Sequence, residues 1–204
     1  MSLLEMNTDL FRLINNLGKE YTLLNPPMIF IAEYLVYFLA AIVLAFWLTR
    51  KERNRIMIIC GTITFVFAEI IGKLSGKLYS NHQPFAELSN VNQLIEKTVD
   101  NSFPSDHTIL FFSFCVSIWL FRKGLWFLLI IIACLVGISR IWVGVHYPAD
   151  IFAGAIISVI SATFVFNVLP KLKLTYRLLD FYERFERLLI PSSTKTKGTK
   201  SKDL

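Results

Sequence analysis

The chain has 204 residues, which suits a single domain, and 54% of them are hydrophobic while only 18% are charged. The apolar residues come in long blocks and not at amphipathic spacing, which excludes the buried helices of a soluble core, because those helices need polar faces. The net charge of +6 comes without a basic face that carries aromatic residues, so the sequence predicts no nucleic-acid partner.

The N-terminal segment, residues 1–27, lacks the early apolar core of a cleaved leader and carries Glu5, Asp9 and Glu20. Its apolar side chains fall roughly on one helical face, which predicts a helix on the membrane surface. Blocks that can cross a bilayer follow, the third of them if its helix starts near Ser105: 28–48, 56–72, 109–121, 125–139 and 151–169. We therefore predict an all-α integral membrane bundle of about five transmembrane helices with amphipathic N- and C-terminal surface helices.

The C-terminal surface helix is predicted from an apolar stripe between Leu174 and Leu189 that arginines interrupt. After Pro191 the residues are small, polar and basic, which is typical of disorder. We predict one membrane-embedded domain over residues 1–190 and a disordered basic tail over 191–204.

Positive charge near the ends of the spans predicts the orientation of the bundle. With five spans, the loop 49–55, the turn 122–124 and the segment after Pro170 share one side and hold fifteen of the 21 Lys and Arg residues. That side and the C-terminus are predicted to be cytoplasmic, and the charge to bind anionic headgroups of membrane lipids. Two polar clusters, "SFPSDHT" (102–108) and "SRIWVGVHYPAD" (139–150), then share the external face.

The cluster at 139–150 has the residue types of a phosphate site. Arg140 stands near the end of a span, where its planar guanidinium suits two phosphate oxygens. His146 and Asp150 lie either side of Pro148, and Asp150 can accept the proton of one imidazole nitrogen and leave the other free to attack. The alternative is a helix cap beside an arginine that binds lipid headgroups.

The cluster at 102–108 precedes an apolar run. Backbone N–H groups at a helix start, with the Ser105 hydroxyl, make an anion site, and His107 can donate a proton to a leaving oxygen. The alternative is Ser105 as a simple N-cap and His107 as an interfacial polar residue. The sequence has no ligand set with zinc spacing, so we predict neither a metal nor another cofactor.

The two clusters resemble signatures of the type-2 phosphatidic acid phosphatase family. "SRIWVGVHYPAD" matches S-R-x5-H-x3-D, and "PSDH" is similar to P-S-G-H. The resemblance implies a helical bundle with its site at the outer rim, where His146 forms a phosphohistidine, Asp150 orients it and His107 protonates the leaving group. It also implies three residues that hold the phosphate oxygens: Ser105, Ser139 and Arg140.

The sequence departs from the family in its first signature, a lysine followed after six residues by Arg-Pro. Gln83 replaces the arginine and Gly76 replaces the lysine. On a continuing helix Lys73 shares the face of residue 76 better than Lys77 does, so Lys73 and Gln83 are predicted to bind phosphate. The alternative for Lys73 is an i,i+4 pair with Glu69.

A second departure is Asp106, which replaces the family glycine and can turn toward Lys73 or Lys77, or cap the helix.

Within the family, "SNHQPF" (80–85) together with both clusters is most similar to the bacitracin-resistance type of undecaprenyl-diphosphatase. This resemblance implies a bacterial cell-membrane hydrolase that recycles the lipid carrier of peptidoglycan synthesis. Phe103, Trp142 and Tyr147 either line the rim for the lipid or anchor the bundle at the interface. Two other functions stay open: a phosphatidylglycerophosphate or phosphatidate phosphatase, and a non-enzymatic membrane subunit of an antibiotic exporter. The sequence does not indicate an oligomeric state.

Overall fold

The computed structural model describes residues 2–189, and the predicted tail 191–204 lies outside this range. The described chain contains helices and no strand, with one isolated bridge between His82 and Asn101, which confirms the predicted all-α class. The α-helices and three short 3-10 helices are, in order, α1 (Leu3–Glu20), η1 (Thr22–Leu24), α2 (Asn25–Glu33), α3 (Leu35–Leu48), α4 (Glu52–Leu78), α5 (Pro84–Glu87), α6 (Asp106–Arg122), η2 (Gly124–Phe127), α7 (Leu128–Trp142), α8 (Pro148–Val168), η3 (Leu169–Lys171) and α9 (Lys173–Leu189).

The chain divides into two compact units, Met1–Pro170 and Lys171–Leu204. The described part of the second unit is chiefly α9, whose apolar side chains are spaced for one helical face, as predicted. The predicted domain boundary at residue 190 lies at the edge of the described residues and stays a prediction.

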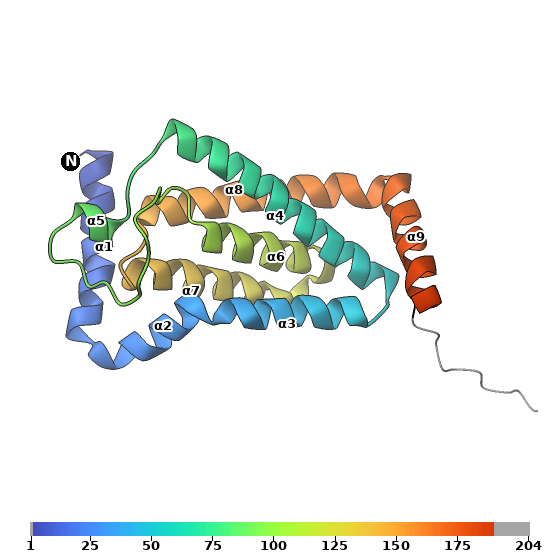
Figure 1. Cartoon of the computed structure of the whole chain (residues 1–204), viewed down its shortest axis with the longest axis horizontal. Coiled ribbons are helices and arrows are strands. Elements are labelled where there is room, and N and C mark those ends of the chain that lie inside the picture. Colours follow the sequence, from blue (N-terminus) through green and yellow to red (C-terminus); the bar gives the residue numbers. More distant parts are fainter. Residues whose placement is uncertain (1, 190–204) are drawn as a thin grey trace, which may run out of the picture. The chain divides into compact units, whose positions relative to one another are not determined.

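The first unit is a bundle with α6 at its centre. α6 packs against α4, α7 and α8, and most of its residues are buried (Figure 1). Among residues 2–189, three helical stretches are long and apolar enough to cross a membrane: Glu52–Leu78, Gly124–Trp142 and Pro148–Lys171. A fourth crossing forms if α2 and α3, which meet at 41°, act as one broken span. The chain is thus a multi-pass membrane protein.

The remaining predicted span, 109–121, corresponds to α6. This helix has 17 residues and is therefore about 26 Å long, short of the ~30 Å hydrocarbon core. Because α4, α7 and α8 pack around α6, most of its apolar side chains are buried inside the protein. At 17 residues α6 is at the lower limit of length for a spanning helix, and the predicted span 109–121 stays a prediction.

A long irregular segment, residues 88–105, connects α5 to α6 and is held by α1. Asn15 of α1 accepts a hydrogen bond from Asn92 N (2.8 Å) and donates to Asn92 O (3.0 Å) and Trp142 O (2.8 Å). Lys19 donates to Asn90 O at 2.5 Å. The amphipathic helix predicted at the N-terminus therefore also orders a loop next to the site described below.

Candidate active site

The two polar clusters meet at one end of the bundle. "SFPSDHT" leads into the first turn of α6, and "SRIWVGVHYPAD" runs from the end of α7 to the start of α8. The backbone joins them directly, because Ser105 N donates to Asp150 O at 3.2 Å. Gly144 has φ +87° between α7 and α8, and this left-handed conformation lets the chain turn back within five residues.

His146 is buried, and its two ring nitrogens have different partners. Nδ1 lies 3.0 Å from the carbonyl oxygen of Ser102 and 3.4 Å from Asp150 Oδ2. Because a carbonyl oxygen only accepts, Nδ1 carries the hydrogen, and Nε2 of the neutral ring keeps its lone pair. Burial, followed by the charges of Lys97 and Arg140, holds the pKa of His146 well below its usual range, so the ring is neutral at physiological pH.

Asp150 stands in the first turn of α8 and organises three neighbours. Its Oδ2 accepts hydrogen bonds from Tyr147 N (2.8 Å) and from the Ser102 hydroxyl, and it lies beside the His146 ring. The carboxylate is fully buried, and the helix N-terminus favours its negative charge. Asp150 thus fixes the position of the imidazole.

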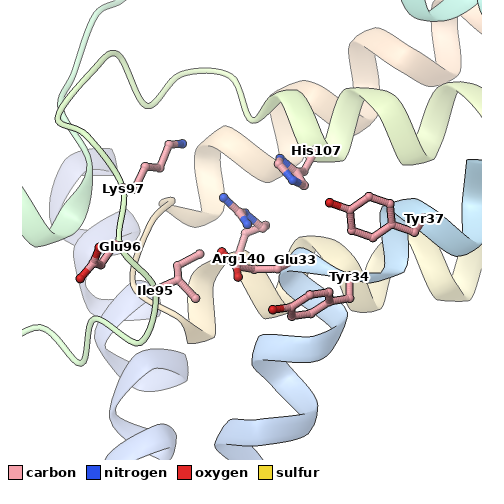
Figure 2. A pocket seen from close by; sticks show the side chains of 8 residues that line it. All are labelled: Glu33, Tyr34, Tyr37, Ile95, Glu96, Lys97, His107 and Arg140. Atoms are coloured by element: carbon pink, nitrogen blue, oxygen red, sulfur yellow. The ribbon is translucent and has the colours of Figure 1, made fainter.

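A pocket of about 430 Å³ opens next to this imidazole. In Figure 2, Lys97, His107 and Arg140 come from three different elements and point toward the same space. His107 lies within electrostatic range of Arg140, His146 and Lys97. One wall of the pocket carries Tyr37, whose hydroxyl points inward in the same view.

Arg140 is 4% exposed and is held at the floor of this pocket. Its Nη1 donates to the carbonyl of Ala32 in α2 at 3.1 Å, and Nε has no hydrogen-bond partner among residues 2–189. A buried guanidinium with an unused donor fits an anion, because an unmet buried donor is costly.

Ser105 and Ser139 are both buried, with different surroundings. No described residue is a hydrogen-bond partner of Ser105 Oγ, so this hydroxyl at the start of α6 can donate to a ligand. Ser139 Oγ donates to Val136 O at 2.7 Å within α7.

Lys73 and Gln83 lie away from the pocket. Lys73 lines a neighbouring pocket of about 300 Å³ together with Lys77 and Asp106. The role of Asp106 stays a prediction. Gln83 is fully buried, and its Oε1 accepts a hydrogen bond from Asp100 N at 2.9 Å. The structure therefore brings His146, Asp150 and Ser105 to the end of the bundle where Arg140 and His107 line the pocket, and His146 is linked to that pocket through Lys97. Lys73 and Gln83 do not line this pocket.

Two site residues escaped the sequence analysis. Ser102 contacts both Asp150 and His146, and Lys97 Nζ lies 3.3 Å from His146 Nε2. Both belong to the irregular segment 88–105, where no periodicity indicates which side chains face inward. A count of the few cations on the predicted external side, which includes Lys97, is the signal that would have singled it out.

The aromatic residues expected at the rim do not line the pocket. Trp142 and Tyr147 are buried, and they donate hydrogen bonds to Asn25 Oδ1 (2.8 Å) and Glu87 Oε2 (3.1 Å). Phe103 packs edge-on against Tyr79. The aromatic residues at the mouth are instead Tyr34 and Tyr37, which are 49% and 68% exposed.

Within residues 2–189, no group of three or more His, Cys, Asp or Glu side chains could hold a metal ion. The pocket is lined by two cations, one imidazole, two tyrosines and two carboxylates, Glu33 and Glu96. Lys97, His107 and Arg140 are the groups of this lining that can bind an anion.

Comparison with known proteins agrees with this geometry. Bacitracin transport permease protein BcrC of Bacillus licheniformis is 55% identical over 203 residues, covering 100% of both chains. Undecaprenyl-diphosphatase BcrC of Bacillus subtilis is 30% identical over 190 residues, covering 93% of this chain and 96% of the relative. The crystal structure of Aquifex aeolicus LpxE matches 79% of this chain and 95% of its own, with TM-score 0.68 and 28% identity. Residues 64–174, which contain both clusters, match the model of the PAP2 superfamily, and the chain belongs to that superfamily.

Proposed function

We propose that this protein hydrolyses undecaprenyl diphosphate to undecaprenyl phosphate and inorganic phosphate through a phosphohistidine. The observation that carries the proposal is the orientation of His146. Its Nδ1 is tied to the Ser102 carbonyl, so the lone pair of Nε2 faces Lys97 at the pocket that Arg140 and His107 line. Relatives named undecaprenyl-diphosphatase, in Bacillus subtilis and Sulfolobus acidocaldarius, support the choice of substrate.

In the first step, His146 Nε2 attacks the terminal phosphorus and the bond from that phosphorus to the bridging oxygen breaks. Burial, followed by the charges of Arg140, His146 and Lys97, lowers the pKa of His107 to about 3, and the negative charge of a bound diphosphate raises it again. His107 then donates a proton to the leaving oxygen of undecaprenyl phosphate. Arg140 and Ser105 hold the oxygens of the transferred group, and the N-terminus of α6 adds backbone donors. Asp150 stabilises the positive charge that develops on the imidazole.

In the second step, a water molecule attacks the phosphohistidine. His107, now neutral, takes a proton from that water, the nitrogen–phosphorus bond breaks, and inorganic phosphate leaves. Nε2 regains its lone pair, and the Nδ1 hydrogen never leaves its carbonyl partner. Lys97, His107 and Arg140 line the pocket, Lys97 and Asp150 contact His146, and Ser105 is joined to Asp150 by a backbone hydrogen bond.

The remaining predicted residues enter the proposal as positioning groups. Gln83 steadies the segment 88–105 through Asp100, and Ser139 steadies the turn of α7 next to Arg140. Lys73 lies in the neighbouring pocket, where its charge acts on Glu69, four residues earlier on the same helix.

The site end of the bundle is proposed to face the outside of the bacterial cell membrane, with the C-terminus cytoplasmic. The opposite end holds the loop 49–55 and the turn at Arg122 and Lys123, where basic residues gather. The diphosphate head of the substrate then enters from the external leaflet, and its tail remains in lipid.

The tail is proposed to lie on an exposed aromatic face of α2 and α3, made by Phe30, Tyr34, Tyr37 and Phe38. Their rings contact one another at centroid distances of 5.8, 5.8 and 6.5 Å, and Tyr34 and Tyr37 also line the pocket. A face that continues from the pocket into the lipid-exposed side of the bundle suits a ligand with an anionic head and an apolar chain.

A second candidate, a subunit of an antibiotic exporter, is favoured by the printed name of the Bacillus licheniformis relative, a bacitracin transport permease protein. Transport needs neither a nucleophile nor a proton donor at the pocket. Loss of chemistry and loss of antibiotic resistance are therefore separable.

The test is phosphate release by the purified protein and by its His146→Ala variant, with undecaprenyl diphosphate, phosphatidylglycerophosphate and phosphatidate as substrates. We expect the wild type to prefer the polyprenyl diphosphate and the variant to lose at least about a thousandfold in kcat. Unchanged release by the variant contradicts the nucleophile, and a preference for either glycerolipid contradicts the substrate. Resistance to bacitracin that persists in cells carrying only His146→Ala supports the exporter.

A further inference from the structure

Lys97 is the residue in closest contact with the attacking nitrogen, and neither the family signatures nor the comparisons assign it a role. Its Nζ lies 3.3 Å from His146 Nε2, and it lines the same pocket as Arg140 and His107 (Figure 2). Its neighbour Glu96 points the other way in this view. Lys97 therefore faces the reacting centre from the segment 88–105, opposite the helices that carry the signatures.

The chemistry of the contact follows from the two partners. An ammonium group only donates, and the Ser102 carbonyl on the other side of the ring requires Nδ1 to carry the hydrogen. The Lys97 ammonium consequently donates to the lone pair of Nε2, the same lone pair that attacks phosphorus. In this structure the lone pair of the attacking nitrogen is therefore engaged in a hydrogen bond from Lys97.

We propose that Lys97 covers the nucleophilic nitrogen of His146 in the empty site and transfers to the oxygens of the terminal phosphate when the diphosphate binds. Substrate binding then has two effects at once: it exposes the lone pair and it gains a charge-assisted hydrogen bond to the group being transferred. This inference rests on the proposed function, since it concerns the same site.

The surroundings of Lys97 support such a transfer. The side chain is part-buried and belongs to an irregular segment, whereas Arg140 is fixed by the carbonyl of Ala32. Lys97 also supplies the charge that the first signature lacks, because Gly76 holds the position of the family lysine and Lys73 lies in another pocket. A lysine has three donors, so it can bind a phosphate oxygen while it moves off the ring.

The neighbouring charges set the balance between the two partners of Lys97. Burial and Arg140 lower the pKa of Lys97, while three carboxylates, Asp106, Asp100 and Asp150, act in the opposite direction. A diphosphate adds negative charge beside Arg140 and draws the ammonium toward it. The free energy that separates the two positions is therefore changed by the substrate itself.

The kinetic test compares Lys97→Met and Lys97→Arg with wild type. Loss of a charge-assisted hydrogen bond predicts a fall of about 10- to 100-fold in kcat/KM for Lys97→Met. Lys97→Arg keeps the charge and should recover most of that loss. Lys51→Met removes an exposed lysine just before α4, at the end of the bundle opposite the site. It is the matched control, and its kcat/KM should equal that of wild type.

A pH profile separates this role from a merely structural one. The charged or titratable groups that face His146 are Arg140 of α7, His107 of α6, Asp150 of α8 and Lys97 itself. Lys97 and Arg140 are the two cations that disfavour the imidazolium of His146, so removal of the Lys97 charge raises the pKa of His146. Activity requires the neutral ring, and the acid limb of kcat/KM should therefore move to higher pH in Lys97→Met and stay in place in Lys97→Arg.

A second readout needs no turnover. Diethyl pyrocarbonate modifies a free imidazole lone pair, and peptide mapping reports the rate at His146 alone. In substrate-free protein we expect faster modification of His146 in Lys97→Met than in wild type or Lys51→Met. Equal rates, or an acid limb that does not move, overturn the inference even if the enzyme is active. If wild type releases no phosphate, the proposed function fails, while the modification rates still decide whether Lys97 covers His146.

Discussion

Arginines stand at both ends of the bundle, Arg140 buried and Arg122 half-buried, and their surroundings differ. At the site end, Arg140 is held by one carbonyl and faces a pocket that also contains His107 and Lys97. At the other end, the Arg122 guanidinium lies over the rings of Phe46 and Trp126, at 5.1 and 5.8 Å from their centroids, and donates to Asn54 Oδ1.

The comparison distinguishes an arginine available to bind a ligand from one that packs against the protein. Arg122 is surrounded by aromatic faces and an amide, which stabilise a cation inside the protein. Arg140 instead lines a pocket with His107 and Lys97, a space that an anion can fill. Basic charge alone therefore does not identify a phosphate site. What identifies it is a fixed cation beside a pocket and a nucleophile.

The sharpest test of this contrast is the same substitution at both ends. Arg140→Lys should lower kcat/KM by about 10- to 100-fold, because an ammonium cannot reproduce a two-pronged contact. Arg122→Lys should leave kcat/KM within about twofold and lower the thermal midpoint instead. Phosphate release and thermal unfolding are measured on both purified variants, and equal losses of activity would remove the distinction.

Within the site end, Ser102→Ala isolates one hydrogen bond. The variant loses the hydroxyl that binds Asp150 but keeps the backbone carbonyl that binds His146. We expect kcat to fall about tenfold with little change in KM, since the hydroxyl orients the pair of Asp150 and His146 and does not touch substrate. Ser75→Ala, which removes a hydroxyl bonded only within its own helix in α4, serves as control. A rise in KM alone would argue for direct contact with the phosphate.

A smaller effect is expected at the aromatic face of α2 and α3. Tyr37→Leu should raise the KM for a long-chain polyprenyl diphosphate a few-fold, because it removes the binding free energy of one aromatic contact. A short-chain prenyl diphosphate has the same head and should be hydrolysed as by wild type. Phe152→Leu changes an exposed aromatic residue on α8 and should affect neither substrate. If Phe152→Leu has the same effect as Tyr37→Leu, the tail has no defined face.

The smallest effect on activity is expected from Asn54→Leu at the other end. This change removes the acceptor for Arg122 and a donor to Thr49 Oγ1, and should destabilise the protein by about 1–3 kcal/mol. The folded fraction should keep its kcat/KM, as measured by activity normalised to folded protein in a denaturation series. Reduced kcat/KM of the folded fraction would mean that the two ends are coupled.

The sequence predicts the site best where helix starts determine geometry. His146 and Asp150 are four residues apart around the start of α8, and Ser105 directly precedes α6, so hydrophobic blocks and local spacing suffice to bring them to one end. The helical class was predictable for the same reason, although the block at 109–121 became a short covered helix.

Prediction from sequence was weakest where the residues show neither helical nor strand periodicity. Lys97 and Ser102 belong to the segment 88–105, and their positions depend on long-range contacts with α1 and α8. Lys73 was predicted from helix geometry alone, but the face of α4 that carries it lines the neighbouring pocket. Trp142 and Tyr147 look interfacial in sequence, yet both are buried and each donates a hydrogen bond to a distant part of the chain.

The contact between α1 and the segment 88–105 adds α1 to the part of the chain that the site requires. Asn15 contributes nothing to any signature, and yet its amide joins Asn92 to the end of α7, five residues upstream of Lys97 and two downstream of Arg140. A chain shortened past Asn15 would retain every signature residue but lose the bridge between its two phosphate-facing cations. The catalytic machinery of this protein thus begins before the stretch that defines its superfamily.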